Sequence, residues 1–592
     1  MRLSAKLTYI MFVHLRNHTH YSLLNALPKI DELVKKASSL SMPAVAITDY
    51  SNMYGVIEFF KACKKQKIKS IIGAEFSIKY NDRVFKIVLL ARNLSGYKNL
   101  MKLTSDVNIE NPLNPVLTDE ILFRYKDGLT VLSGGMWGDI SNLLVINEQE
   151  AISRLTLYKE QLGEYFFLEI NPQLQMDHGK EMRAKTITLA KQTGTPLVAT
   201  WNTHYLHTTD KQAHKTLYMI HGEENTSLEY NHLFQKDNFS FVDENEAAEQ
   251  FKDVPEALSN TLLIADSCDL EIPLGSWVFP AIEYVKSYDE DLRDLAYEGL
   301  SVRKMELTDL VKKRLDYELK VIADKGYSPY FLVVYDLLRF ARENEILTNI
   351  RGSVAGSLVT YLLRITKCDP IAYKLPFERF LNPERPSAPD IDMDYSDTKR
   401  DSVIDYARSK YGIDNVAQIG TFGTMMARGA VRDVARAMKY PYVVGDRISK
   451  MIPPPKQGFP VTIASALIDV PELKAVYDTD REVQTILDMA QKIEGCARHI
   501  SVHAAGTVVS PSPLWDFTPI QKDPKGGKII TQYDMYVIED AGLLKFDFLG
   551  IRNLTILGDA LKITKQRYGV DVDIEDIPLD DKKTNINKKN SF

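Results

Sequence analysis

Acidic side chains recur at every second position in the segment DIDMDY, residues 390–395. Alternate residues of a β-strand share one face, so we expect Asp392 and Asp394 to project together, about 6–7 Å apart along the chain. Two carboxylates this close repel one another unless a cation lies between them, and Mg²⁺ prefers oxygen ligands of this kind. From the spacing alone, metal binding and a solvated acidic edge are equally open interpretations.

A third carboxylate stands in the segment GLLKFDFLG, residues 542–550. Asp547 lies between Phe546 and Phe548, and strand alternation puts Lys545 on the same face as Asp547. A charge within so apolar a run is costly to bury unless it is paired. The pattern indicates a strand whose charged group needs a partner.

The segment RGSVAGSLVTYLLRI, residues 351–365, has the features of a phosphate-binding helix start. Gly352 and Ser353 immediately precede a predicted helix, and the start of a helix offers unpaired N–H groups and a positive dipole end to phosphate oxygens. Ordinary capping by Ser353 is the alternative. The apolar face of this predicted helix comprises Val354, Leu358, Tyr361, Leu362 and Ile365.

A phosphate site, a carboxylate pair on one strand and a third carboxylate on another are together the equipment of two-metal phosphoryl transfer. In such a reaction one ion would activate a 3′-hydroxyl and the other would hold a triphosphate. This hypothesis explains why the protein tolerates so many acidic side chains in one place: metal ions would neutralise them.

These segments occur with further motifs that together resemble the bacterial replicative DNA polymerase III alpha subunits, of polymerase family C. The resemblance follows the family's order over nearly the whole chain. It rests on the segments RGSVAGSLVTYLLRI, FERFLNPERPSAPDIDMDY, TFGTMMARGAVRDVARAM, RHISVHAAGTVVS and GLLKFDFLGIRNLTI.

The resemblance implies a DNA-directed DNA polymerase that adds deoxynucleotides to a primer 3′-hydroxyl with two Mg²⁺ ions. It implies that Asp390 is structural and that three aspartates bind metal and are catalytic, and it assigns nucleotide binding to a glycine, a serine and a lysine. The implied catalytic residues are Asp392, Asp394 and Asp547, and the implied nucleotide-binding residues are Gly352, Ser353 and Lys545.

Three arginines recur every fourth residue in TMMARGAVRDVARAM, at Arg428, Arg432 and Arg436. On a helix they would form one stripe, opposite an apolar face, and could follow a DNA backbone. A solvated helix face is the ordinary explanation of such a stripe, and the resemblance favours DNA contact. Arg498, His499 and His503 are further expected neighbours of the active site.

The first part of the chain resembles the polymerase-and-histidinol-phosphatase (PHP) domain, a barrel with metal ligands at its strand ends. Here Arg16 replaces the first histidine of the HxHxxxS motif, Tyr50 replaces a histidine, and Asn202 replaces an acid. Four expected ligands remain, and they would hold at most one Zn²⁺ or Mn²⁺ ion. We favour a structural barrel with little or no 3′–5′ exonuclease activity. The remaining ligands are His18, Asp49, Glu75 and His204.

The elements that must position these residues indicate a multidomain α/β protein. Six strand-like runs, from PAVAIT to PLVAT, alternate with helical patterns and predict a parallel sheet, open or closed into a barrel. The resemblance implies a distorted (β/α) PHP barrel, a mixed α+β nucleotidyltransferase palm similar to that of polymerase beta, and a helical thumb. The expected domains are a tail at 1–11, the PHP domain at 12–273, the palm at 274–423 and 503–556, the thumb at 424–502, and the start of the fingers at 557–592.

Composition sets broad limits on function. The chain of 592 residues exceeds one hydrophobic core, and its net charge of −6 means that nucleic acid must bind to local basic surfaces. Four widely spaced cysteines without a CxxC pair argue against zinc knuckles and fit a reducing cytoplasm. No apolar run reaches the roughly 18 residues of a membrane helix. Met11 is an alternative start to Met1.

The expected partners are primer-template DNA and deoxynucleoside triphosphates. If the missing C-terminal part is supplied, a sliding clamp, a clamp loader and a proofreading subunit are also expected. The resemblance places most of the fingers after Asp547, so polymerisation by these 592 residues alone is not expected. Two alternatives stay open: a PHP-type metal-dependent phosphoesterase, and an inactive fragment that binds DNA or replication proteins.

Overall fold

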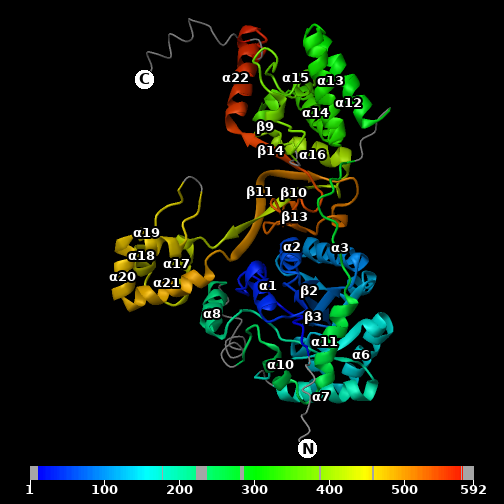
Figure 1. Cartoon of the computed structure of the whole chain (residues 1–592), viewed down its shortest axis with the longest axis vertical. Helices are drawn as coiled ribbons and strands as arrows, with labels where there is room; N and C mark the ends of the chain where they lie inside the picture. The colour runs from blue at the N-terminus through cyan, green and yellow to red at the C-terminus, as the bar shows by residue number, and fades with distance from the viewer. Residues whose placement is uncertain are drawn as a thin grey trace, which may run out of the picture. The chain divides into compact units, whose positions relative to one another are not determined.

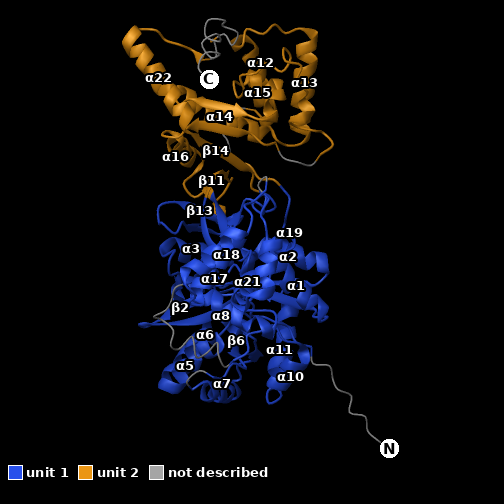
Figure 2. Cartoon of the chain, turned by 90° about the vertical axis from the view of Figure 1, so that its left-hand side faces the viewer, with its two compact units in different colours: residues 1–276, 419–502, 515–542 blue, residues 277–418, 503–514, 543–592 orange. Residues whose placement is uncertain are grey.

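The structure, a computed structural model, describes residues 11–175, 178–221, 237–280, 286–385, 389–456, 459–574 and 577. The chain forms two compact units (Figure 2), each assembled from three stretches of sequence. Unit 1 comprises residues 1–276, 419–502 and 515–542, and unit 2 comprises residues 277–418, 503–514 and 543–592. Most of the expected N-terminal tail and the end of the expected fingers segment lie outside the described residues.

A curled sheet forms the centre of the first part of unit 1 (Figure 1). All six strand-like runs of the sequence form strands here, in the order β1-β2-β3-β5-β6-β7, with a short β4 beside β2. The strands are β1 (Ala44–Ile47), β2 (Lys69–Tyr80), β3 (Arg83–Ala91), β4 (Val116–Leu117), β5 (Leu129–Leu132), β6 (Phe166–Ile170) and β7 (Leu197–Ala199).

The sheet is mixed, and the prediction of a parallel sheet was wrong for β3. This strand runs antiparallel to both β2 and β5, whereas β1 and β2, β5 and β6, and β6 and β7 are parallel pairs. Only Asn81 and Asp82 join β2 to β3, which is far too short for the crossover that parallel neighbours require. Asn81 has φ +53°, the left-handed conformation that asparagine tolerates in hairpin turns.

Residues 14–18 bridge the two ends of the curled sheet. On one side the N–H of Ala46 donates to the carbonyl of His14, and on the other the N–H of His18 donates to the carbonyl of Thr203, both over 3.0 Å. Arg16 and His18 are both fully buried in this bridging segment. The bridge therefore fixes the side chains of the PHP motif inside the barrel.

Helices surround this sheet, and the first shows how the sequence pattern produces one. Its residues Ile30, Leu33, Val34 and Ala37 recur at helical spacing, and all four are buried, as predicted. The helices of this part are α1 (Ile30–Ser39), α2 (Val56–Gln66), α3 (Leu94–Glu110), α4 (Asp119–Arg124), α5 (Asp139–Ile146), α6 (Glu148–Leu162), α7 (Gly179–Thr193), α8 (Lys211–Ile220), α10 (Glu244–Gln250) and α11 (Pro255–Ser267).

Unit 1 also contains the expected thumb segment as a group of helices, together with strands of a second sheet in the order β12-β13-β10-β11. One hydrophobic core contains residues from α8 and from the thumb helices alike. These elements are α17 (Ala427–Ala437), α18 (Tyr442–Met451), α19 (Ile463–Asp469), α20 (Pro471–Thr479), α21 (Arg481–Ile493), β10 (Val416–Thr424), β11 (Ala497–Val509), β12 (Ile520–Lys522) and β13 (Ile529–Asp534).

Unit 2 is built on strands in the order β11-β14-β9-β8, covered by helices over a core of its own. Of the strands of the second sheet, β10 and β11 have residues in both units. The remaining elements of unit 2 are β8 (Thr348–Arg351), β9 (Asp392–Ser396), β14 (Lys545–Ile551), α12 (Tyr288–Val302), α13 (Asp309–Asp324), α14 (Ser328–Glu343), α15 (Leu358–Leu362), α16 (Arg400–Tyr411) and α22 (Arg552–Tyr568).

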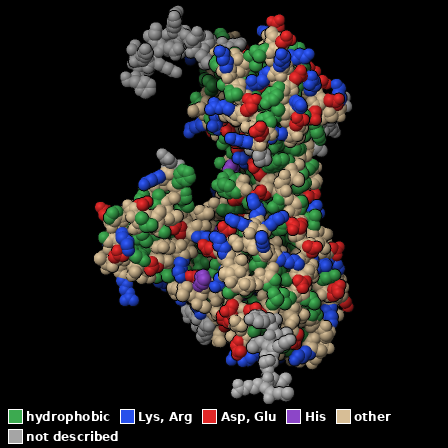
Figure 3. Space-filling view, in the orientation of Figure 1, with side chains coloured by type: hydrophobic (Ala, Val, Ile, Leu, Met, Phe, Trp, Pro, Cys, Tyr) green, Lys and Arg blue, Asp and Glu red, His purple; other side chains and the backbone are tan. Residues whose placement is uncertain are grey.

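Charge and surface character agree with the composition. Figure 3 shows basic and acidic side chains interspersed over the face that it presents, in a chain of net charge −6. All four cysteines are free thiols. Within the described ranges, no helix combines the length and the apolar character needed to cross a membrane.

Candidate active site

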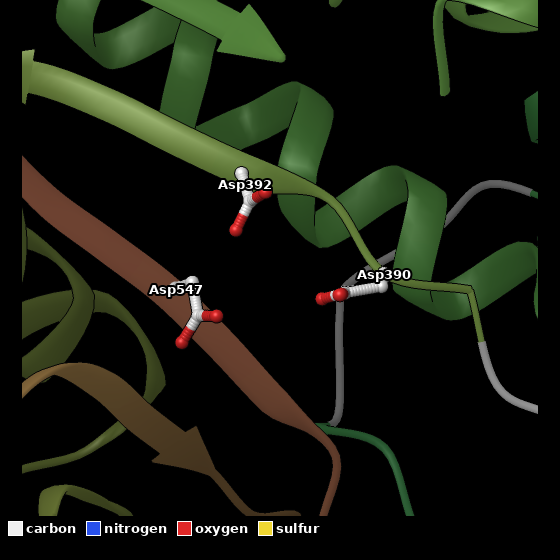
Figure 4. A group of neighbouring side chains, drawn as sticks. All are labelled: Asp390, Asp392 and Asp547. Atoms are coloured by element: carbon white, nitrogen blue, oxygen red, sulfur yellow. The ribbon is translucent and has the colours of Figure 1, made fainter. Parts of the chain in front are cut away.

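Two neighbouring strands of unit 2 bring acidic side chains together. β14 runs parallel to β9, and Asp547 is paired in register with Asp392. Asp390 stands just before β9, and its side chain faces the same space as the other two (Figure 4). One carboxylate oxygen from each of Asp390, Asp392 and Asp547 lies within 4.8 Å of the others. We call this group the carboxylate cluster.

Strand alternation explains why the acids gather on one face. Ile391, Met393 and Phe546 point to the opposite side of the two strands and belong to the core of unit 2. Burial of these apolar residues fixes the register of β9 and β14, because a shift by one residue would turn the carboxylates into the core. Burial of the apolar face of each strand therefore positions the acidic side chains on the opposite face.

Asp394 does not join the carboxylate cluster. Its Oδ2 accepts a hydrogen bond from Arg351 Nε over 2.7 Å, and its Oδ1 accepts one from Arg351 Nη2 over 3.0 Å. Arg351 lies on β8, directly opposite Asp392 in the antiparallel pair. The resemblance implied Asp394 as the second catalytic carboxylate and Asp390 as structural, whereas the geometry gives Asp390 the place in the cluster and gives Asp394 an arginine partner.

The environment of the cluster favours a cation. Asp547 is only 8% exposed, its Oδ2 lies 3.0 Å from Lys545 Nζ, and its Oδ1 is buried without a hydrogen-bond partner. Burial raises the pKa of Asp390, and the nearby charges of Asp392 and Asp547 raise it further, against the effect of Lys545. Three converging carboxylates with an unsatisfied oxygen fit a divalent cation that prefers oxygen ligands.

His503 lies near the same group. Its Nδ1 accepts a hydrogen bond from the N–H of Gly506 over 2.7 Å, and Gly506 is paired in register with Asp547. Burial lowers the pKa of His503, while Asp547 acts in the opposite direction. The sequence prediction that His503 neighbours the active site therefore agrees with this geometry.

The Gly352–Ser353 turn borders the cluster. Gly352 has φ +95° and ψ −161°, a conformation open essentially to glycine alone, and a Cβ added there would lie 4.0 Å from Asp392 Oδ2. The predicted helix begins later than expected: residues Ser353–Gly356 form a 3₁₀ turn, and α15 starts at Leu358 with Ser357 as its N-cap. Ser353 therefore belongs to a separate turn and does not cap α15.

The N-terminus of α15 is already occupied by a protein carboxylate. Glu318 of α13 is fully buried and accepts hydrogen bonds from the N–H groups of Leu358 and Val359 and from the Ser357 hydroxyl. Its carboxylate supplies the negative charge that a helix dipole attracts, so phosphate binding at this helix start was the wrong expectation. The Gly352–Ser353 turn remains the candidate phosphate contact.

The three arginines of α17 have different surroundings. Arg428 is half-buried, and its Nε and Nη2 donate to the carbonyl of Ile452 over 2.7 and 2.5 Å. Arg436 is exposed and pairs with Asp433 over 3.0 Å, and Arg432 is exposed. Arg428 thus satisfies a carbonyl just after α18, and the two exposed arginines present charge to solvent.

The remaining expected neighbours of the active site, Arg498 and His499, lie in unit 1. Arg498 donates to Asp433. The ring of His499 lies so close to Gly423 that a Cβ there would come within 2.5 Å of it. Both side chains therefore contact the strand and helix beside them within unit 1.

In the PHP barrel, the guanidinium of Arg16 occupies the centre of the expected metal site. Arg16 Nε donates to Glu75 Oε2 and its Nη1 donates to Glu169 Oε1, both over 2.7 Å. His18 Nε2 lies 3.2 Å from Glu75 Oε2. Burial works to raise the pKa of Glu75, but Arg16 and then His18 hold it below its usual value. Both glutamates are almost completely buried, and each gives one oxygen to the arginine, while Glu75 Oε1 and Glu169 Oε2 are buried without a hydrogen-bond partner.

The other expected ligands have partners of their own. Asp49 accepts hydrogen bonds from the N–H and hydroxyl of Thr19 and from the Ser22 hydroxyl. His204 is hydrogen-bonded through Nδ1 to the carbonyl of Asn25, and burial holds its pKa well below the ordinary value. These residues form a connected protein network.

A divalent ion does not fit this centre. Arg16 and the half-buried Lys86 already balance the charges of Glu75 and Glu169, so a divalent cation would add two uncompensated positive charges. A divalent ion needs several ligand atoms close together. Among the described residues, three acidic, histidine or cysteine side chains come close enough to share an ion in the carboxylate cluster of unit 2, and not in the PHP barrel. The PHP barrel thus keeps the architecture of a metal site while an arginine takes the position of the cation.

Sequence reasoning missed three residues of these two centres. Glu169 lies in the apolar run YFFLEI, where a single charge signals a buried partner. Arg351 opens the RGS motif, but its partner lies on another strand 43 positions away in sequence. Glu318 sits in an ordinary amphipathic helix, so nothing in its local pattern indicated a capping role.

The fold and these two sites define a class of protein: a PHP domain joined to a nucleotidyltransferase-type domain. Residues 14–173 match the family model of the PHP domain, and residues 290–550 match that of the bacterial DNA polymerase III alpha NTPase domain. The DNA polymerase III alpha subunit of Escherichia coli O157:H7 is 39% identical over 97% of this chain and 51% of its own length. Those of Vibrio cholerae and Borreliella burgdorferi are 38% and 37% identical, with the same coverage.

The chain therefore carries the PHP and DNA polymerase III alpha NTPase domains and is similar over nearly its whole length to DNA polymerase III alpha subunits, which confirms the resemblance seen in the sequence. It spans about half the length of the curated relatives that it matches.

Proposed function

We propose that this chain is the part of a DNA-directed DNA polymerase that carries the catalytic carboxylates. The reaction is attack of a primer 3′-hydroxyl on the α-phosphate of a deoxynucleoside triphosphate. The observation that supports it best is the meeting of Asp390, Asp392 and Asp547 beside the Gly352–Ser353 turn. This arrangement occurs in a chain similar to polymerase III alpha subunits over 97% of its length.

The residues proposed to hold two Mg²⁺ ions are Asp392, Asp394 and Asp547. When bound, such ions polarise the attacking hydroxyl and neutralise charge on the phosphates. Asp390 adds negative charge on the open side of the cluster. Lys545, held by Asp547, contributes a positive charge near the phosphates, and the backbone of the Gly352–Ser353 turn contacts the triphosphate.

We assign the palm to residues 274–423 and 503–556 and the thumb to residues 424–502, which include α17–α21. Primer-template DNA is the expected substrate, and Arg432 and Arg436 are the exposed arginines of α17 proposed to contact its backbone. Arg428 is left out of this role because its Nε and Nη2 already donate to the carbonyl of Ile452. The expected setting is the cytoplasm, with a sliding clamp, clamp loader and proofreading subunit as partners once the rest of a polymerase is present.

The alternative activity, a PHP-type phosphoesterase, is disfavoured by the position of Arg16. Its guanidinium is bonded to both Glu75 and Glu169, two carboxylates that a catalytic metal would need. We propose that this barrel supports the polymerase part structurally and that 3′–5′ exonuclease activity is absent from it.

Primer extension tests the proposal. The purified chain is assayed with a primed DNA template, with and without a separately expressed polypeptide that corresponds to the second half of the relatives. We expect extension in the presence of that polypeptide, and Asp547→Asn should reduce its rate at least about a hundredfold because a metal-binding charge is lost.

The matched control is Asp559→Asn, which neutralises an exposed aspartate on α22 and should leave the rate unchanged. Absence of extension under both conditions by a folded protein, or equal rates for the two variants, would contradict the proposal. In the second case, the extension would not depend on the cluster.

A further inference from the structure

Arg351 occupies both carboxylate oxygens of Asp394, one of the proposed metal-binding residues. Its guanidinium binds both oxygens of Asp394, over 2.7 and 3.0 Å, and the carboxylate is only 4% exposed. A bidentate contact between arginine and carboxylate is among the strongest polar contacts in proteins. A divalent ion that approached Asp394 would have to displace this contact and would meet the positive charge of the guanidinium.

The carboxylate cluster, by contrast, keeps a carboxylate oxygen that no protein group binds. Asp547 Oδ1 is buried without a hydrogen-bond partner, and the Asp547 carboxylate lies close to those of Asp390 and Asp392 in the carboxylate cluster (Figure 4). The structure thus holds one complete group of carboxylates and one carboxylate, Asp394, that is sequestered by a neighbouring side chain. Two-metal chemistry requires both.

Arg351 can reach a second anion. Its side chain is 50% exposed, and the residue directly precedes the Gly352–Ser353 turn, the proposed contact of the triphosphate. A triphosphate carries more negative charge than one carboxylate, and the planar guanidinium binds phosphate oxygens in the same two-pronged way. Arg351 therefore lies between two competing anions, one belonging to the protein and one to the substrate.

We propose that Arg351 is an exchange switch. Without nucleotide it holds Asp394; when a triphosphate occupies the Gly352–Ser353 turn, the guanidinium moves from Asp394 to a phosphate, and Asp394 becomes available to a second divalent ion. This inference rests on the proposed function and adds a positioning residue to it. Binding of the nucleotide and binding of the second ion are then coupled, and the coupling is reciprocal.

Divalent-ion binding provides the first test. Mn²⁺ bound to the full 592-residue chain is counted by electron paramagnetic resonance without nucleotide. We expect one tightly bound ion in the unaltered protein and two in Arg351→Gln, because that change frees Asp394. The matched control is Arg379→Gln, which removes an exposed arginine of the same unit outside these strands and should leave one ion.

Nucleotide binding in EDTA provides the second test, because it involves no metal. Arg351→Gln should weaken dATP binding roughly tenfold or more, since two charge-assisted hydrogen bonds to phosphate are lost. Asp394→Asn should strengthen binding by a similar factor because it releases Arg351. In the double variant the gain from Asp394→Asn should vanish, which separates release of the arginine from simple removal of a negative charge.

Each outcome decides between the switch and the proposed function. An unchanged Mn²⁺ count in Arg351→Gln, or a gain from Asp394→Asn that persists without Arg351, overturns the switch and leaves the proposed function standing. A folded, unaltered chain that binds neither Mn²⁺ nor dATP overturns the proposed function itself. Asp547→Asn provides the reference for loss of the first ion.

Discussion

At the scale of single residues, the PHP centre shows how an arginine can pair with two buried carboxylates at once. A buried carboxylate is unstable without a cation, and Glu75 and Glu169 share one, the guanidinium of Arg16. The ring of Trp137 lies 4.9 Å from the Arg16 Cζ and adds a cation–π contact. The arginine is thus held by anions on two strands and by an aromatic face.

Substitution of Arg16 should therefore be strongly destabilising. We expect Arg16→Met to lower the free energy of unfolding of unit 1 by about 3–5 kcal/mol, because two buried carboxylates lose the charge that pairs with them. Hydrogen exchange of β2 and β6 amides at increasing urea concentration measures this loss. Zn²⁺ or Mn²⁺ should not stabilise the unaltered barrel, since a ligand stabilises only a state that binds it.

The control for this variant is Arg124→Met, which removes an exposed ion pair with Glu120 and should leave the unfolding free energy nearly unchanged. A loss at Arg16 no greater than the loss at Arg124, or a clear rise in stability on addition of Zn²⁺, would show that the arginine does not act as the internal cation.

Residue types alone located both sites but not the contacts inside them. The substitutions at Arg16 and Tyr50 predicted a damaged metal site, which stays a prediction, and strand alternation correctly put Lys545 beside Asp547. The pairing of Asp394 with Arg351 was not predictable, since Arg351 comes from β8. Such a contact depends on strand pairing between distant parts of the chain, which no local pattern encodes.

At the scale of elements, the Gly352–Ser353 turn determines how the chain passes the carboxylate cluster. Local apolar periodicity predicted a helix here, and α15 does form, but a 3₁₀ turn precedes it. Glu318 fixes the start of α15 through two backbone N–H groups, which separates the turn from the helix. Periodicity predicts that a helix exists; its first residue depends on a capping group that, here, comes from another helix.

A methyl group at the turn tests its importance. Gly352→Ala should cost about 1–3 kcal/mol of stability in unit 2, because φ +95° with ψ −161° is strained for any residue with a Cβ. We also expect weaker dATP binding, since relief of that strain moves the turn away from Asp392. Urea unfolding of the full chain and nucleotide titration measure the two effects.

Gly429→Ala is the matched control, because Gly429 lies inside α17 with nothing within 4 Å of an added Cβ. There the same change should be neutral or stabilising by up to about 1 kcal/mol, as alanine favours helix over glycine. Equal stability and equal dATP affinity in both variants would mean that the turn does not need its unusual backbone.

At the scale of the whole molecule, compact units do not follow the order of the sequence. The PHP segment and the expected thumb segment were predicted as separate domains, yet both lie in unit 1. α8 packs against α17 and α21, and residues such as Leu217 and Leu487 share one hydrophobic core. The cysteine thiol of Cys496 and the Leu27 carbonyl also lie 3.8 Å apart, in the same region.

Sequence patterns could not reveal this arrangement. Each segment shows its own amphipathic periodicity, and a buried face looks the same whether it packs within its own domain or against a distant segment. The burial of Leu487 and the burial of Leu217 were therefore each predictable, whereas their membership in a common core was not. Because the core is shared, we expect the thumb helices and α8 to unfold cooperatively, so that loss of packing in the thumb lowers the stability of α8 as well.

Truncation of Leu487 tests this cooperativity. Leu487 is fully buried in α21, so Leu487→Ala should destabilise unit 1 by about 2–5 kcal/mol through lost apolar contact and a residual cavity. Hydrogen exchange should accelerate in α8 of the PHP segment as well as in α17 and α21, because the three helices share their core. Ile468→Ala, at a side chain that is 82% exposed, should leave all three helices unchanged. If Leu487→Ala accelerates exchange in α17 and α21 while α8 stays protected, the thumb and the barrel unfold independently and the shared core does not couple them.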